Sequence, residues 1–367
     1  MRYAAPGMAL VIPTIEALAP YEGGKPIEEL ARELGITDAV KLASNENPLG
    51  PSPRALQAAR EVLSDVNRYP DGAAYTLRAK LAAKHGVGMN EVLLGCGSNE
   101  LLDLAVRTFC TPESHIVFAE PAFVVYRIAA MAAGVPFTAV PLTARLEHDL
   151  PAMAAAVTPQ TRLLFVANPN NPTGTHVGRA AVEQLLREVP PEVLIVMDEA
   201  YLEYADAADY PDSLELRGLR ERLIVCRTFS KIYGLAALRV GYAVSTPTII
   251  DYMNRVRAPF NVSTPAQAAA IAALDDHDHV QTSRALNLKE RQRVSEALRA
   301  RGLGVAPSQA NFVLVDVKRP ARPVYDALLR RGVIVRPFAS LPTSLRVTLG
   351  TERENDRFLA ALAEVLT

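Results

Sequence analysis

Short apolar runs alternate with amphipathic stretches from Val92 to Val244, and this alternation limits the possible folds more than any other feature of the chain. Stretches such as Leu101–Phe109 and Ala180–Glu188 have the spacing of a helix with one buried face. The apolar runs are Val92–Leu94, Ile116–Phe118, Phe137–Val140, Leu163–Val166, Val193–Met197, Leu223–Cys226 and Val240–Val244. Buried strands that alternate with helices are typical of a largely parallel sheet covered on both faces. The sequence therefore predicts an α/β fold built on a seven-stranded sheet.

The pattern changes after the last of these runs, and the change predicts a second, smaller domain. Residues 251–303 have the composition of long helical material, which is most clearly amphipathic over residues 281–301. We expect a large domain at residues 44–264, a small α+β domain at residues 265–367, and an N-terminal arm, residues 1–43, that packs near the small domain. The elements expected outside the large domain are strands at Phe312–Val315, Val333–Arg336 and Leu345–Leu349, and helices at Pro26–Leu34, at Pro323–Arg330 and from Glu352.

Composition and charge argue against several classes of function. The net charge is −1, so no excess of positive charge favours nucleic acid or an anionic membrane. No apolar run approaches the roughly 18 residues of a membrane-spanning helix. Three cysteines, Cys96, Cys110 and Cys226, lie in apolar surroundings, which is typical of a reducing compartment, and we expect a cytoplasmic protein. The segment at residues 275–279 lacks the ligand spacing of a metal site, so we expect a solvated loop there and no metal.

A single lysine stands at the end of one expected strand. Lys231 follows the run Leu223–Cys226 in a chain that has seven lysines and thirty-two arginines. A lysine in this position can form a Schiff base with a carbonyl compound, which an arginine cannot do. Because most single lysines are simply solvated, Lys231 becomes informative only together with its neighbours.

Two segments near Lys231 suit a bound phosphate. Gly97, Ser98 and Asn99 open a helix after the first strand, where backbone amides can face an anion. Ser230 follows the sixth run and Arg239 directly precedes the seventh. The planar guanidinium of Arg239 can bind phosphate through two nitrogens. Each segment alone could be an ordinary turn, but both follow strands of one sheet, where doubly wound folds bind their ligands.

Four further side chains suit a planar ring that contains a nitrogen atom. Phe123 can stack on such a ring, although a core aromatic is the simpler interpretation. Asn171 is held in a turn with two prolines, and Asp198 ends a buried run where a carboxylate needs a cation or strong donors. Tyr201 follows three residues later. Together with the phosphate groups and Lys231, these residues predict a site for pyridoxal 5′-phosphate.

The motifs also resemble those of a known family. The matching segments are Asn45–Pro51, Arg68–Pro70, Asn171–Gly174, Asp198–Tyr201 and Ser230–Lys231 with Arg239. From about Tyr21 to the C-terminus, the chain resembles the fold-type I, class-II aminotransferases that depend on pyridoxal phosphate, and within them the histidinol-phosphate aminotransferase family. The resemblance implies transfer of an amino group from histidinol phosphate to 2-oxoglutarate.

The resemblance implies a role for each residue that matches the cofactor site. Lys231 would bind the cofactor covalently and carry the proton, and Asp198 would pair with the ring nitrogen. Tyr201 and Asn171 would contact the ring hydroxyl, while Phe123 would stack on the ring. The implied phosphate ligands are Gly97, Ser98, Asn99, Ser230 and Arg239.

Substrate binding and a homodimer are also implied by the resemblance. Tyr69 would reach into the site of a neighbouring subunit. The implied substrate contacts are Tyr21, Asn45, Arg336 and Arg346. Because one guanidinium suits both carboxylate and phosphate, Arg346 and Arg336 are expected to serve both substrates.

Two departures and three alternatives accompany this interpretation. Phe123 stands where many relatives have tyrosine, which keeps the stacking but removes a hydroxyl, and Ser98-Asn99 stands where some members carry Ala-Asp. An aromatic amino-acid aminotransferase is the nearest alternative, followed by a decarboxylase of a phosphorylated amino acid. A pyridoxal-phosphate-binding regulatory module is less expected, because such proteins usually carry a DNA-binding domain ahead of the segment that starts here near Tyr21.

Overall fold

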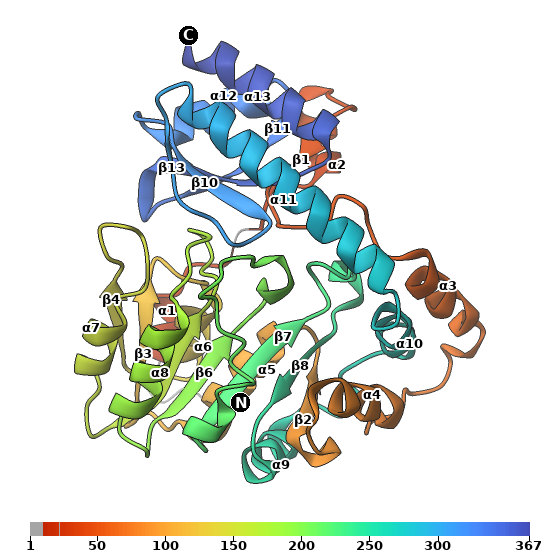
Figure 1. The fold of residues 1–367 in the computed structure, drawn as a ribbon, viewed down its shortest axis with the longest axis vertical. Helices are drawn as coiled ribbons and strands as arrows, with labels where there is room; N and C mark the ends of the chain where they lie inside the picture. Colours follow the sequence, from red (N-terminus) through yellow and green to blue (C-terminus); the bar gives the residue numbers. More distant parts are fainter. Residues whose placement is uncertain (1–9, 22) are drawn as a thin grey trace, which may run out of the picture.

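A seven-stranded sheet forms the centre of the molecule in the computed structural model, which describes residues 10–21 and 23–367 (Figure 1). The strand order is β2-β8-β7-β6-β5-β3-β4. All pairs are parallel except those of β8, which runs antiparallel to β2 and β7. The strands are β2 (Val92–Gly95), β3 (His115–Glu120), β4 (Phe137–Pro141), β5 (Thr161–Ala167), β6 (Leu194–Asp198), β7 (Leu223–Thr228) and β8 (Gly241–Val244). The seven predicted strands and the α/β class are confirmed.

Helices cover both faces of this sheet, which explains why its strands read as continuous apolar runs. On one face, Leu164 and Ile195 pack in a cluster with α3, α4, α7, α8 and α10. On the other face, Phe165 and Val196 pack in a cluster with α5, α6 and α9. The helices are α3 (Pro53–Glu61), α4 (Tyr75–His85), α5 (Ser98–Phe109), α6 (Val125–Ala132), α7 (Leu150–Ala155), α8 (Arg179–Glu188), α9 (Pro247–Val256) and α10 (Thr264–Ala273). The alternation of side chains along each strand therefore fills two cores at once.

The C-terminal part forms a separate antiparallel sheet at the top of Figure 1, in the order β12-β13-β10-β9. Its apolar face packs on α12, α13 and the long helix α11. The elements are α11 (His277–Arg299), β9 (Gly304–Val305), β10 (Phe312–Asp316), α12 (Ala321–Leu329), β12 (Arg336–Phe338), β13 (Leu341–Thr348) and α13 (Glu352–Leu366). Among the residues described, no helix is both long and apolar enough to cross a membrane.

The segment that precedes the large sheet contacts the C-terminal part. Strand β1 (Val40–Lys41) pairs in parallel with β11 (Val333–Ile334). The arm also contains the helices α1 (Pro13–Glu16) and α2 (Ile27–Leu34). The strand expected at Val333–Arg336 is therefore wrong as a single element, because β11 pairs with the arm while β12 pairs with β13.

The long helical stretch expected at residues 251–303 is also interrupted. Helix α9 ends at Val256, and α10 begins only at Thr264. Phe260 between them has a positive φ of 55°, which a helix excludes, and Ser263 caps α10 by accepting a bond from a backbone amide. The expected loop at residues 275–279 is loop only in part, because α11 starts at His277 with Asp276 as its N-cap.

Candidate active site

Polar side chains meet in a cavity of about 250 Å³ at the carboxyl ends of the central strands. The cavity lies where ligands bind in open α/β sheets, because strand ends leave backbone and side-chain groups free. Most of the residues singled out in the sequence line it. They are Tyr21, Asn45, Ser98, Asn99, Phe123, Asn171, Asp198, Tyr201, Ser230, Lys231, Arg239 and Arg346.

Lys231 projects into this cavity just beyond the end of β7. Its Nζ donates a 3.2 Å hydrogen bond to the backbone oxygen of Ser44 and lies 5.6 Å from the centre of the Tyr201 ring. Burial, helped by the nearby Arg346 guanidinium, lowers the pKa of Lys231 to about 8. A lowered pKa increases the unprotonated fraction, which is the form that attacks a carbonyl carbon.

Asp198, the last residue of β6, offers one free carboxylate oxygen to the cavity. Its Oδ2 accepts a 2.8 Å hydrogen bond from the hydroxyl of the buried Tyr126. Its Oδ1 is buried and has no partner among the residues described. Burial raises the pKa of Asp198 to about 6, and the Tyr126 hydroxyl opposes that rise. A buried oxygen in this state calls for a donor from a bound molecule, and a protonated ring nitrogen is such a donor.

Sequence reasoning missed Tyr126. The signal was its spacing, because Tyr126 lies three residues after Phe123 and the two rings meet edge to face at 6.0 Å. Tyr126 also stacks on Phe165 of β5, at a centroid distance of 4.8 Å. This packing fixes the ring, and therefore the hydroxyl that orients Asp198.

The turn between β2 and α5 forms a cradle beside the guanidinium of Arg239. Gly97 has φ 72°, and a Cβ atom there would lie 2.3 Å from Nη2 of Arg239. Ser98 and Asn99 form the first turn of α5, whose free amides favour negative charge. Arg239 donates a 3.2 Å hydrogen bond to Oγ of Ser230. The guanidinium, the hydroxyl and the helix N-terminus thus converge on one place.

Arg346 brings the C-terminal sheet into the same cavity. Its Nη1 donates to Oδ1 of Asn171 at 2.5 Å, and its Nη2 donates to the backbone oxygen of Ala43 at 2.6 Å. Burial lowers the pKa of Arg346 to about 10, so the side chain remains charged at neutral pH. Nearby, Nδ2 of Asn45 donates to the hydroxyl of Tyr201 at 2.9 Å. These contacts bring two of the residues expected to bind substrate next to two expected to bind the cofactor.

Three of the expected residues do not line this cavity, and one of them, Gly97, lies directly beside it in the turn before Ser98. Arg336 lines an adjoining cavity of about 570 Å³, to which Tyr21, Phe123 and Arg346 also belong, and it donates to the backbone oxygen of Gly23 at 2.6 Å. Tyr69 lies elsewhere on the surface, where its side chain is 82% exposed.

Comparison with known proteins assigns the chain to a family. The model of the aminotransferases of class I and II matches residues 37–362. The chain belongs to this family, whose members depend on pyridoxal 5′-phosphate.

Similar proteins of known name cover almost the whole chain. One is histidinol-phosphate aminotransferase 2 of Pseudomonas aeruginosa, which is 54% identical over 98% of both chains. Another is histidinol-phosphate aminotransferase of Moorella thermoacetica, which is 51% identical over 96% of this chain and 92% of its own. Among solved structures, histidinol-phosphate aminotransferase of Sinorhizobium meliloti in complex with pyridoxal-5′-phosphate is 31% identical, covers 98% of both chains and has a TM-score of 0.89.

The residues of the cavity fit this cofactor. The cradle at Gly97 suits its phosphate, and the unpaired oxygen of Asp198 suits its ring nitrogen. Lys231 lies in the same cavity, with its pKa lowered towards neutrality. The half-buried ring of Phe123 lines the cavity wall and can stack on the cofactor ring.

Proposed function

We propose that this protein transfers the amino group of histidinol phosphate to 2-oxoglutarate, forming imidazole acetol phosphate and glutamate. The observation that carries the proposal is the pair of arginines, Arg346 and Arg336, in the cavity of Lys231 and in the cavity that adjoins it. Arg346 lines both the cavity of Lys231 and the adjoining cavity, which Arg336 also lines, so a substrate that extends from Lys231 into the adjoining cavity would meet two guanidiniums. A guanidinium binds phosphate and carboxylate alike, as the two substrates require. The names of the relatives that match over nearly the whole chain support the same substrate.

Each residue of the cavity has a role in this reaction. Pyridoxal phosphate supplies a protonated ring that withdraws electrons from the α-carbon of the substrate. Asp198 holds the proton on the ring nitrogen, and Tyr126 orients Asp198. Lys231 would take the α-proton and deliver it again, because it lines the cavity and its lowered pKa makes the unprotonated amine available. Tyr201 and Asn171, which line the same cavity, would hold the ring hydroxyl.

The absorbance spectrum of the purified protein tests cofactor and substrate together. Addition of histidinol phosphate should remove the absorbance band of the lysine-bound cofactor, and glutamate should appear once 2-oxoglutarate is present. Phenylalanine should react more slowly at equal concentration. Faster reaction with phenylalanine would favour an aromatic aminotransferase, and release of carbon dioxide without glutamate would favour a decarboxylase.

We also propose a cytoplasmic homodimer in which Tyr69 completes the partner's site. Tyr69 is far more exposed than a tyrosine usually is, and it stacks on the half-exposed Phe260 at 4.7 Å. Leu63, Val66 and Tyr75 from the same stretch of chain are also more than half exposed. An apolar surface of this kind suits a second copy of the chain. The three cysteines are free thiols, as expected in the cytoplasm.

Hybrid dimers test the shared site. Tyr69→Ala and Lys231→Ala should each be nearly inactive as homodimers. In their hybrid, one site carries both defects and the other carries neither, so random mixing should restore about one quarter of the wild-type activity. No restored activity, with hybrid formation verified by a tag on one subunit, would show that Tyr69 does not act across the interface.

A further inference from the structure

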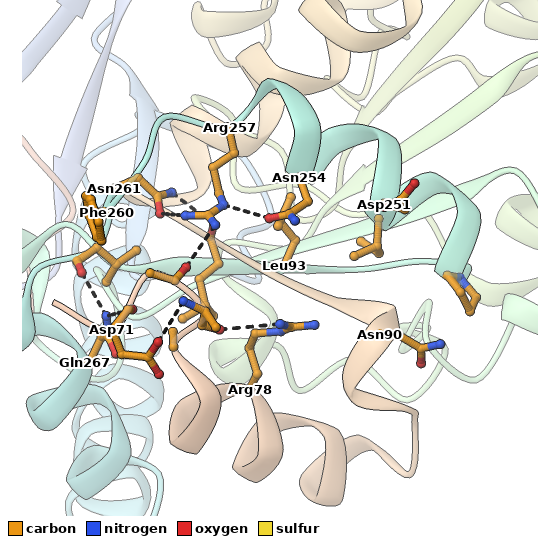
Figure 2. Close-up of a pocket in the computed structure, with 17 residues that line it drawn as sticks. Asp71, Arg78, Asn90, Leu93, Asp251, Asn254, Arg257, Phe260, Asn261 and Gln267 are labelled. Carbon is orange, nitrogen blue, oxygen red and sulfur yellow. Dashed lines mark hydrogen bonds between the residues drawn. The ribbon is translucent and has the colours of Figure 1, made fainter.

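A second cavity, of about 150 Å³, lies apart from the catalytic cavity and contains two arginines (Figure 2). It is bounded by the loop after Tyr69, by α9 and by residues 257–262. The acceptors recorded for Arg78 and Arg257 are all uncharged oxygen atoms. Both arginines therefore donate to backbone and amide oxygens, and these hydrogen bonds join separate segments of the chain.

Asn261, on one side of this cavity, is hydrogen-bonded to residues on either side of the phosphate-binding turn. Oε2 of Glu100 accepts from the backbone amide of Cys96 at 2.5 Å and from Nδ2 of Asn261 at 2.6 Å. Nδ2 of Asn261 also donates to the backbone oxygen of Leu94 at 3.2 Å. Leu94 precedes the turn that contains Cys96 and Gly97, and Glu100 follows it. Asn261 is therefore bonded to both sides of the turn that forms the cradle. A carboxylate in the first turn of a helix often has only a capping role, but this one is shared with a distant loop.

The other side is bonded to the loop that carries Tyr69. Nη1 of Arg257 donates to Oδ1 of Asn261 at 2.6 Å, and Nη2 donates to the backbone oxygen of Gly72 at 2.9 Å. A Cβ atom on Gly72 would lie 3.3 Å from the ring of Phe260, and that ring stacks on Tyr69. Figure 2 shows Arg257 between Asn254, Asn261 and the loop of Asp71. Arg257 therefore helps to position the Tyr69 loop, together with Gln267, whose Nε2 donates to the backbone oxygen of Asp71 at 3.0 Å.

We infer that Arg257 and Asn261 are positioning residues that couple the phosphate-binding turn of one subunit to the Tyr69 loop that serves its partner. The continuous path runs from Cys96 through Glu100, Asn261 and Arg257 to Gly72. This inference rests on the proposed homodimer. Its consequence is that damage to the path changes two active sites, the subunit's own through the turn and the partner's through Tyr69.

Cofactor binding by the cofactor-free protein tests the end of the path at the turn. In Asn261→Ala, pyridoxal 5′-phosphate should bind about tenfold more weakly, as expected for the loss of a hydrogen bond to a charged group. Pyridoxal, which lacks the phosphate, should bind as it does to the wild type. Arg255→Met is the matched control, because Arg255 is exposed and its contacts in the described structure, with Asp251 and with the ring of Tyr252, stay within its own helix. Equal weakening of both ligands, or of neither, would overturn the role of Asn261.

Hybrid dimers test the end of the path at Tyr69. Arg257→Lys keeps the charge but cannot bond Gly72, Asn254 and Asn261 together, and it avoids the larger cavity of an alanine substitution. The variant is placed either on a subunit with an intact Lys231 or on a partner that carries Lys231→Ala. Activity at the one remaining site should fall several-fold in both arrangements.

The two arrangements distinguish an effect of Arg257 within its own subunit from coupling to the site of the partner. A loss only when Arg257→Lys and the live site share a subunit would overturn the coupling while leaving the dimer intact. If Tyr69→Ala and Lys231→Ala fail to complement each other in the earlier test, the shared site itself is absent, and the failure lies in the proposed dimer. Sedimentation of each variant checks that Arg257→Lys still forms dimers at the assay concentration.

Discussion

At the scale of single residues, the site combines groups whose ionisation is shifted by burial in opposite directions. Burial makes Lys231 easier to deprotonate and Asp198 harder to deprotonate, because the charged form of each loses solvation. The two effects place a nucleophile and an acid near neutrality within one cavity. Lys231→Ala should abolish turnover without unfolding the protein, since within the described residues the Lys231 side chain makes a single hydrogen bond, to the backbone oxygen of Ser44.

The lowered pKa of Lys231 predicts a pH-dependent cost to folding. The unfolded chain titrates this group near 10.5 and the folded, cofactor-free protein near 8, so the folded state binds fewer protons between these values. The cost is fully present below pH 8 and disappears as the pH rises to 10.5. We expect Lys231→Met to stabilise the cofactor-free protein on the order of 2 kcal/mol at pH 7, because each pKa unit corresponds to about 1.4 kcal/mol and solvent in the cavity screens part of the effect. Urea unfolding at pH 7 and pH 10 measures it, and an equal difference at both pH values would contradict the lowered pKa.

Tyr126→Phe tests how Asp198 is held. The substitution removes the hydroxyl that lowers the pKa of Asp198, so that pKa should rise further above about 6. Asp198 must be ionised to hold a protonated ring nitrogen, and its binding energy is therefore lost as the pH falls. Titration of the cofactor-free variant between pH 5 and 8 should show about tenfold weaker cofactor binding near pH 6, consistent with one lost charge-assisted hydrogen bond. The loss should begin at a higher pH than in the wild type. Parallel curves for the two proteins would mean that Tyr126 only packs.

At the scale of elements, the sequence predicts what local pattern determines and misses what distant partners determine. The seven strands were predictable because all but the half-buried edge strand β4 are largely buried and they lie between helices of clear periodicity. Residues that follow strand ends were predictable as neighbours for the same reason. The bond between Tyr126 and Asp198 joins residues 72 positions apart, and no local pattern signals it beyond the spacing from Phe123. The separation of β11 from β12 was missed because it depends on pairing with β1.

The turn between β2 and α5 supplies a prediction at this scale. Gly97→Ala adds a Cβ atom at a positive φ and against Nη2 of Arg239. Gly86→Ala is the matched control, because Gly86 has φ 62° with no atom within 4 Å of a new Cβ. Gly86→Ala should cost about 1 kcal/mol of folding stability through backbone strain, and Gly97→Ala should cost more, about 1–3 kcal/mol, because its ψ of 168° lies in a region that essentially only glycine adopts. Only Gly97→Ala should also weaken cofactor binding, by at least about tenfold, because the guanidinium must leave the cradle. Thermal unfolding and cofactor titration measure the two effects, and equal cofactor affinity in both variants would show that the cradle tolerates a methyl group.

At the scale of the whole molecule, the cavity depends on segments from both ends of the chain. The backbone of Ala43 accepts from Arg346, and the backbone of Asn45 accepts from the side chain of Asn311, which follows α11. The amide of Asn45 also donates to Oγ1 of Thr348 on β13. The sequence motifs around these residues predict that they share a site, but not that they bond one another. These bonds hold the segment of Ala43 and Asn45 against the C-terminal part, and the bond from Asn45 to Tyr201 joins the same segment to the large domain.

Arg346 is the residue through which this arrangement should act on both substrates. It reaches the cavity from β13, uses two nitrogens on Asn171 and Ala43, and has a buried Nε without a partner among the described residues. Arg346→Ala should raise KM about 100-fold for histidinol phosphate and for 2-oxoglutarate, the size expected for a buried charge-assisted pair. Arg346→Lys keeps the charge but loses the planar fork, so it should recover only part of the affinity. Steady-state kinetics with each substrate varied in turn measure these constants. An unchanged KM for one substrate would remove Arg346 from that half of the reaction and leave Arg336 as the group that binds its anion.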